Sequence, residues 1–149
     1  MRAASPYSAS AHATILLVDD NADGILARRS VLQELGYTVV SACSGHEALK
    51  LAATEKFDLV ITDYKMSPVD GLELIRRLRD SQFKQPIILL TGFADNLGLR
   101  PDTTGADVVI QKSSNEVVTL VRHTKRLINT PRKPAASQPK PLARQSRVK

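Results

Sequence analysis

Five short apolar runs recur along the chain at intervals that leave room for a helix after each one. The runs are rich in Val, Ile and Leu and are mostly continuous rather than alternating, which is typical of parallel strands covered on both faces. They span residues 14–19, 37–42, 57–63, 86–91 and 107–112. This pattern predicts an α/β fold, a doubly wound five-stranded parallel sheet with right-handed crossovers.

Helical signals fill most of the gaps between the runs. Capping-box spacing, a Ser followed three residues later by a Glu, occurs at Ser44–Glu47 and again at Ser113–Glu116. Gly36 is placed to end the first helix. The fourth gap contains Gly98 and Pro101, so we expect any helix there to be short or irregular.

The excess positive charge of the chain lies in its last twenty residues. All Asp and Glu residues precede residue 130, and the net charge of +6 matches the six Lys and Arg residues of segment 130–149. That segment is also rich in Pro and poor in large apolar residues, so we expect it to be disordered. The sequence therefore predicts a flexible N-terminal arm over 1–12, one folded domain over 13–129, and a basic Pro-rich tail over 130–149.

Several classes of protein are disfavoured by what the sequence lacks. No apolar stretch approaches the roughly 20 residues that a membrane helix needs, and the N-terminal segment has no apolar core of a signal peptide. Cys43 is the single cysteine, which excludes an internal disulfide, fits a reducing cytoplasm and suggests a small packing residue. The Gly-rich phosphate-binding motifs of nucleotide-binding folds are absent from the sequence. We therefore expect a cytoplasmic protein that does not insert into a membrane.

Polar residues that can do chemistry stand where the apolar runs end. Asp19 and Asp20 end the first run and Asp63 ends the third. Because ligands of such sheets bind at the carboxyl ends of the strands, we expect the three acids in one crevice. Like charges gathered there require a hard cation, so the sequence predicts a Mg²⁺ site. The hydroxyl of Thr91 and the ammonium of Lys112, at the ends of two later runs, would complete a phosphoryl site.

The segments that carry these residues resemble the receiver domain of bacterial two-component response regulators. They read TILLVDDN, VITDYKMSPVDG, LLTG and VVIQK, and the resemblance covers about residues 13–129 in the family's order. It implies a flavodoxin-like (βα)5 fold with strand order 2-1-3-4-5. It also implies a stand-alone signalling domain in a phosphorelay, which assists its own phosphoryl transfer and dephosphorylation without being an enzyme.

The resemblance also implies a Mg²⁺ ligand set. Asp20 would bind the ion directly, and Asp19 would bind it mainly through water. Asp63 and the backbone carbonyl of Lys65 would complete the protein ligands. The side chain of Lys65 could also overhang the phosphoryl group.

The phosphoryl group itself would be held by residues from three strand ends. Asp63 would be the phosphoacceptor, taking the group from a phosphohistidine. Thr91 would hydrogen-bond one phosphoryl oxygen and Lys112 would pair with another. Gly92 would leave room for the group beside the backbone.

The chain departs from the family pattern in three places. Ser113 replaces the usual proline after Lys112, and a cis bond before serine would cost about 3 kcal/mol, so the local loop is expected to differ. The proline that follows the acceptor is shifted by one position, to Pro68. Val109 stands where receivers commonly carry Tyr or Phe, and a valine cannot make the aromatic ring's inward swing. We therefore hypothesise that the signal is read out through residues 93–104.

The resemblance implies a sensor histidine kinase or phosphotransfer protein as the phosphoryl donor, an unknown downstream protein as the target, and a monomer or weak dimer. The alternative is a switch-impaired, receiver-like binding module that acts independently of phosphorylation. Val109 and the interrupted fourth gap favour this alternative, whereas the intact set of acids argues against it. A hydrolase of the haloacid dehalogenase type is disfavoured because Lys65 stands where its second acid would be.

The basic tail supports a separate hypothesis. Its six positive charges could bind nucleic acid or an acidic partner non-specifically. The tail has no aromatic residue for base stacking, so recognition of a nucleic-acid sequence is not expected. A solubilising extension explains the same composition equally well.

Overall fold

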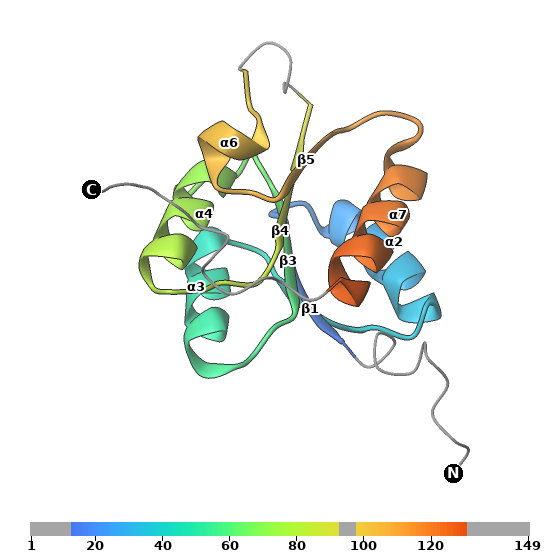
Figure 1. The fold of residues 1–149 in the computed structure, drawn as a ribbon, viewed down its shortest axis with the longest axis horizontal. Coiled ribbons are helices and arrows are strands. Elements are labelled where there is room, and N and C mark those ends of the chain that lie inside the picture. The colour runs from blue at the N-terminus through green and yellow to red at the C-terminus, as the bar shows by residue number, and fades with distance from the viewer. Residues whose placement is uncertain (1–12, 93–97, 131–149) are drawn as a thin grey trace.

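Five parallel strands form one sheet in the computed structural model, which describes residues 13–92 and 98–130 (Figure 1). The strands are β1 (Thr14–Val18), β2 (Thr38–Ala42), β3 (Leu59–Asp63), β4 (Ile87–Thr91) and β5 (Val108–Gln111). Their order across the sheet is β2-β1-β3-β4-β5. The predicted fold class and strand order are confirmed. The predictions for residues 1–12, for the tail beyond residue 130 and for residues 93–97 lie outside the described residues.

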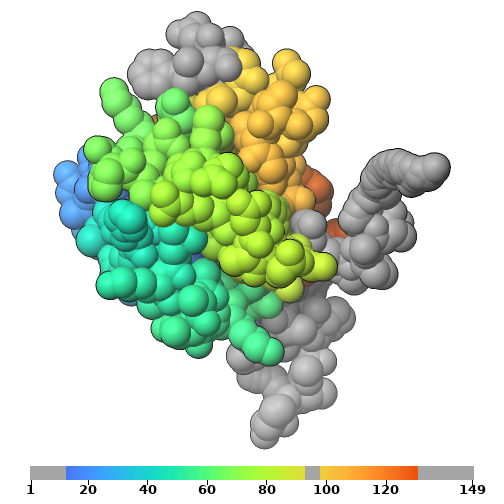
Figure 2. Space-filling model, turned by 90° about the vertical axis from the view of Figure 1, so that its left-hand side faces the viewer, coloured from blue at the N-terminus to red at the C-terminus, as the bar shows by residue number. Residues whose placement is uncertain are grey.

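Helices cover both faces of the sheet, as a doubly wound fold requires. The helices are α2 (Ala22–Glu34), α3 (Gly45–Thr54), α4 (Gly71–Asp80), α6 (Pro101–Thr104) and α7 (Glu116–Asn129). In Figure 1, α2 and α7 lie on one side of the strands, and α3, α4 and α6 lie on the other. Figure 2 views this second side, with α4 between α3 and the segment of α6. The short α6 confirms the expectation for the fourth gap, within the part that is described.

The strands are buried on both faces because successive side chains point to opposite sides. Ile15 and Leu17 of β1 pack into the core beneath α2 and α7, together with Leu32 of α2. Leu16 and Val18 of the same strand pack into the core beneath α3 and α4. This double burial explains why the apolar runs are continuous in the sequence.

Ladder hydrogen bonds continue past the strand ends and hold the site residues in register. The N–H of Tyr64, which follows β3, donates to the carbonyl of Leu90 on β4 at 2.8 Å. The N–H of Lys112, which follows β5, donates to the carbonyl of Thr91 at 2.8 Å. The carboxyl ends of β3, β4 and β5 are therefore fixed side by side.

One predicted capping box is half formed. The Ser44 hydroxyl accepts a hydrogen bond from the N–H of Glu47 at 3.1 Å, as expected. The Glu47 carboxylate, however, reaches Cys43, accepting from its N–H at 2.9 Å and lying 3.3 Å from its sulfur. Cys43 is exposed, so the expectation that it is a packing residue was wrong. The cysteine comes after the last residue of an edge strand, beyond the reach of the core.

The second predicted capping box does not form. Helix α7 begins at Glu116 with Asn115 as its N-cap, two residues later than the Ser113–Glu116 spacing predicts. The Ser113 hydroxyl instead accepts from the N–H of Asn115 at 3.2 Å. The Glu116 carboxylate pairs with Arg28 of α2, a buried arginine, and not with the backbone at Ser113.

Candidate functional site

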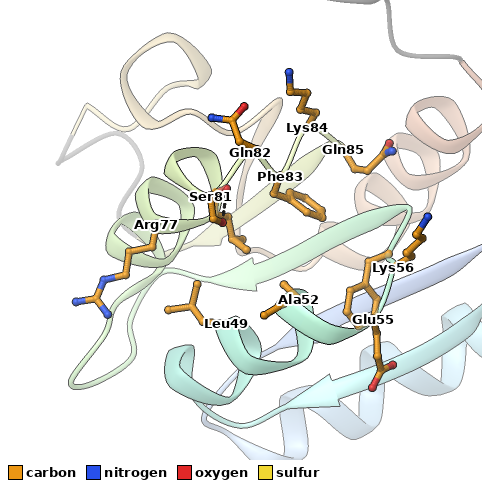
Figure 3. Close-up of a pocket in the computed structure, with 13 residues that line it drawn as sticks. Leu49, Ala52, Glu55, Lys56, Arg77, Ser81, Gln82, Phe83, Lys84 and Gln85 are labelled. Atoms are coloured by element: carbon orange, nitrogen blue, oxygen red, sulfur yellow. Dashed lines mark hydrogen bonds between the residues drawn. The ribbon is translucent and has the colours of Figure 1, made fainter.

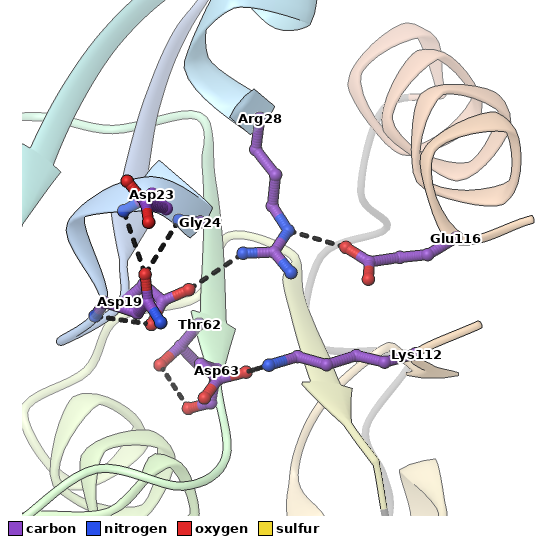
Figure 4. Close-up of polar contacts among 9 residues, drawn as sticks. Asp19, Asp23, Gly24, Arg28, Thr62, Asp63, Lys112 and Glu116 are labelled. Carbon is purple, nitrogen blue, oxygen red and sulfur yellow. Dashed lines mark hydrogen bonds and ion pairs between the residues drawn. The ribbon is translucent and has the colours of Figure 1, made fainter. Parts of the chain in front are cut away.

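Asp63 is a buried carboxylate at the carboxyl end of a central strand. It is the last residue of β3 and only 5% exposed. Its Oδ1 forms an ion pair with the ammonium group of Lys112, which follows β5 (Figure 4). Burial raises the pKa of the Asp63 carboxyl above its ordinary value, and the nearby charge of Asp19 raises it further, while Lys112 opposes both effects.

Asp19, which follows β1, is also buried, and both of its oxygens have partners. Oδ1 accepts the N–H of Asn21 at 3.0 Å, and Oδ2 accepts Nη1 of Arg28 at 2.8 Å. Asp20 is exposed. Within residues 13–92 and 98–130, no three His, Cys, Asp or Glu side chains are grouped so as to hold a metal ion. The structure thus brings Asp19 into electrostatic range of Asp63 and leaves Asp20 at the surface.

Arg28 is the site residue that sequence reasoning missed. Its guanidinium lies between two carboxylates, with Nη1 on Asp19 and Nε 2.6 Å from Oε2 of Glu116 at the start of α7 (Figure 4). Burial lowers the pKa of Arg28, but Glu116 and Asp19 more than compensate, so the pKa is raised overall. The helical spacing of Ile25 and Leu32 puts position 28 on the buried face, and a charge there was the available signal.

Thr91 and Lys112 lie where the sequence predicts them. Thr91 is the last residue of β4 and is buried. The backbone N–H of Lys112 donates a hydrogen bond to the backbone carbonyl of Thr91. The peptide bond between Lys112 and Ser113 is trans. The missing proline therefore leaves the lysine in place.

The other predicted residues surround this edge of the sheet. Gly92 borders open space, since a Cβ added there would meet no described atom within 4 Å. Lys65 is exposed, two residues beyond Asp63. Val109 is half-buried and packs into the core beneath α3 and α4. It therefore lies on the opposite face of the sheet from Arg28.

Gly71 is a second feature whose role the sequence did not reveal. It is the first residue of α4, and its N–H donates to the carbonyl of Tyr64 at 2.8 Å. A Cβ at this position would lie 2.5 Å from the carbonyl oxygen of Asp63 and 2.9 Å from the Cα of Tyr64. The absent side chain lets α4 begin directly against the backbone that carries Asp63.

The chemistry of the predicted donors suits a hard cation such as Mg²⁺, although among the described residues the three acids are not gathered into one cluster as the sequence predicts. The carboxylates of Asp19 and Asp63 are two buried like charges. The exposed carboxylate of Asp20 comes directly after Asp19, and the backbone carbonyl of Lys65 lies two residues after Asp63. Oxygen ligands of this kind are those that Mg²⁺ prefers. In the structure, cationic side chains of the protein balance the two buried charges, Lys112 at Asp63 and Arg28 at Asp19.

A groove at the other end of the sheet is separate from this site (Figure 3). It lies between the C-terminal ends of α3 and α4 and the loops that enter β3 and β4. Its apolar lining comprises Leu49, Ala52, Ala53, Phe57, Leu78 and Phe83. Because it opens at the amino ends of the strands, it has no part in chemistry at Asp63.

Similarity to known proteins agrees with this geometry. PhoP of Bacillus subtilis, an alkaline phosphatase synthesis transcriptional regulatory protein, is 38% identical over 102 residues, which is 66% of this chain and 41% of PhoP. The chain thus spans less than half the length of that relative. None of the helices in the described ranges is long and apolar enough to span a membrane.

Two solved structures share the fold. The response regulator TrrA of Thermotoga maritima, in complex with Mg²⁺ and BeF, is 34% identical with a TM-score of 0.70, covering 77% of this chain and 98% of TrrA. The receiver domain of the Pseudomonas aeruginosa sensor histidine kinase PA1611, with magnesium in its active-site cleft, is 26% identical with a TM-score of 0.72, covering 80% and 99%.

The family model of the response regulator receiver domain matches residues 15–122, which include the residues of the site and all five strands apart from Thr14, the first residue of β1. The resemblance drawn from the four sequence segments is thereby confirmed. The chain belongs to the response regulator receiver domain family of two-component systems.

Proposed function

We propose that this receiver domain accepts a phosphoryl group on Asp63 from a histidine kinase or phosphotransfer protein, with Mg²⁺, and signals through changed protein contacts. The observation that carries the proposal is the buried Asp63 carboxylate paired with Lys112 at the carboxyl edge of the sheet. A carboxylate in such a position can act as a nucleophile beside a ready positive charge.

The proposed step transfers one group and balances its charges. An oxygen of Asp63 attacks phosphorus as the phosphorus–nitrogen bond of a phosphohistidine breaks, and the imidazole nitrogen keeps the electron pair and takes up a proton. The Lys112 ammonium donates a hydrogen bond to one phosphoryl oxygen, and the Thr91 hydroxyl donates to another. Gly92 leaves space at this side. The domain is the acceptor of the group, and we do not propose that it turns over a separate substrate.

Mg²⁺ would be held by Asp19, Asp20, Asp63 and the backbone carbonyl of Lys65. When bound, the ion offsets the repulsion between the carboxylates and the phosphoryl oxygens. Support comes from the two similar structures that contain the ion, TrrA and the PA1611 receiver domain. We further propose that the domain works in the compartment of its kinase, the cytoplasm.

The alternative is a binding module that kept the fold and acts without phosphorylation. The half-buried Val109 favours it, because no aromatic ring is present at that position to change its packing when Asp63 is modified. The two functions differ in one observable property. Partner binding depends on phosphorylation and Mg²⁺ in the first and on neither in the second.

The deciding experiment measures intact mass after incubation with acetyl phosphate and Mg²⁺. We expect a gain of one phosphoryl group in the natural chain and none with Asp63→Ala or without Mg²⁺. Asp102→Asn, which changes an exposed aspartate on α6, is the matched control and should be labelled normally. A chain that gains no mass under conditions that label another receiver would refute the phosphoacceptor function.

A further inference from the structure

The guanidinium of Arg28 connects the acid site to a helix that contributes no predicted ligand. It is buried, with a side-chain exposure of 9%, and it pairs with Asp19 after β1 and with Glu116 at the first position of α7. The two contacts use different nitrogens, Nη1 for Asp19 at 2.8 Å and Nε for Glu116 at 2.6 Å. Arg28 can therefore lose one partner and keep the other.

Asp19 has no free oxygen while Arg28 is in place. The Asn21 N–H occupies Oδ1, and Arg28 occupies Oδ2. The Asp19 side chain is only 3% exposed, so water cannot easily replace either partner. A cation that uses this carboxylate must compete with the guanidinium, because two positive charges cannot share one oxygen without repulsion.

Gly24 provides the space in which this pair is built. A Cβ at Gly24 would lie 2.6 Å from Oδ2 of Asp19 and 2.9 Å from Nη1 of Arg28. Glycine is a poor helix former, yet it stands here in the first turn of α2. The helix thus carries a locally unfavourable residue at a position where a side chain would collide with the ion pair.

We infer that Arg28 is a positioning residue of the metal site. It acts as an internal counter-ion that neutralises Asp19 in the metal-free domain and releases the Asp19 carboxylate when Mg²⁺ binds. This inference rests on the proposed Mg²⁺-dependent function. On release from Asp19, the guanidinium stays with Glu116, whose carboxylate it already touches. Arg28 therefore weakens Mg²⁺ binding, and metal occupancy changes the ion pair at the start of α7.

The test is a calorimetric Mg²⁺ titration of the natural chain and of Arg28→Met, which keeps an unbranched apolar stem and removes the charge. We expect Arg28→Met to bind Mg²⁺ about tenfold more tightly, equivalent to about 1.4 kcal/mol. Arg29→Met is the matched control. It removes the same charge from the next residue, which contacts Ser41 and the carbonyl of Val39 rather than Asp19.

A second readout follows the start of α7, where Glu116 pairs with Arg28. In the natural chain, Mg²⁺ should shift the amide NMR signals of residues 116–120, and in Arg28→Met this shift should be lost. Glu116→Gln should weaken Mg²⁺ binding severalfold, because the released guanidinium then has no carboxylate to keep. Glu116→Gln replaces Arg28→Met as the test variant if Arg28→Met shows no cooperative unfolding and is therefore not folded.

The outcomes separate the inference from the proposed function. Equal Mg²⁺ affinity of the natural chain and Arg28→Met would overturn the role of Arg28 and leave the metal site standing. An equal gain in Arg29→Met would assign the effect to net charge and would also overturn it. If no variant binds Mg²⁺, the proposed metal site is refuted along with the inference.

Discussion

The ammonium group of Lys112 forms an ion pair with Oδ1 of Asp63, although β4 lies between β3, which ends at Asp63, and β5, which ends one residue before Lys112. The lysine reaches across because its own N–H is fixed to the carbonyl of Thr91, at the end of that intervening strand. The pair joins three strand ends into one site. It also places a positive charge beside a carboxylate whose burial would otherwise favour the neutral form.

Replacing Lys112 should slow phosphorylation strongly and leave the domain folded. The lysine side chain is 35% exposed, so Lys112→Met costs little burial. It removes a donor that would stabilise the transferring group, and loss of one such donor typically slows a reaction about 100-fold. The rate of labelling by acetyl phosphate, followed by intact mass, checks this. Lys84→Met, at an exposed lysine of the opposite sheet end, should label at the natural rate.

Asp63→Asn should stabilise the domain at neutral pH. Burial raises the pKa of Asp63 in the folded state above that of the unfolded chain, so ionisation of this carboxyl opposes folding above the folded-state pKa. The amide removes that cost. As pH falls through the folded pKa towards the unfolded value of about 3.9, the advantage of the variant should vanish.

Urea unfolding of the natural chain and of Asp63→Asn, at several pH values between neutral and acid, shows whether the stability difference shrinks as the pH falls. The exposed Asp102→Asn serves again as the control, since it changes an aspartate without changing the buried pair. A stability difference that grows as the pH is lowered would contradict the prediction.

Gly24→Ala should destabilise the domain although the residue is helical. Alanine normally stabilises a helix relative to glycine by up to about 1 kcal/mol. Here the new methyl group would lie 2.6 Å from an oxygen of Asp19, and we expect a net loss of about 1–2 kcal/mol. Ser30→Ala, at an exposed position of the same helix, should be neutral or slightly stabilising. The free energies of unfolding of the two variants and the natural chain test this prediction. Stabilisation in both variants would contradict a steric collision at Gly24.

Gly71→Ala and Gly92→Ala should differ sharply in stability. At Gly71 the added Cβ meets backbone atoms of Asp63 and Tyr64, which cannot move aside as a flexible side chain can, so we expect a loss of about 2–3 kcal/mol. At Gly92 it meets no described atom within 4 Å, so the change should stay within about 0.5 kcal/mol. Thermal and urea unfolding measure both variants. Equal losses would show that packing of α4 against the acceptor strand is not what requires glycine.

The sequence by itself determined the architecture and much of the site. Continuous apolar runs imply strands buried on both faces, and parallel strands bring their carboxyl ends to one edge. That argument is enough to bring Asp63, Thr91 and Lys112 to the same edge of the sheet, where the structure has them. Burial patterns and strand ends are local properties of the chain, and a sequence displays them directly.

Only the tertiary structure decided how the charges at this edge are paired. Arg28 and Glu116 are 88 residues apart and no local spacing relates them, yet they form an ion pair, and α7 begins at Glu116 without the predicted cap at Ser113. Asp19 is buried and paired with the guanidinium of Arg28, whereas Asp20 is exposed, although the two aspartates are adjacent in the sequence. Periodicity and capping rules describe short segments, whereas the cost of burying a charge is met by whichever partner the folded chain brings near.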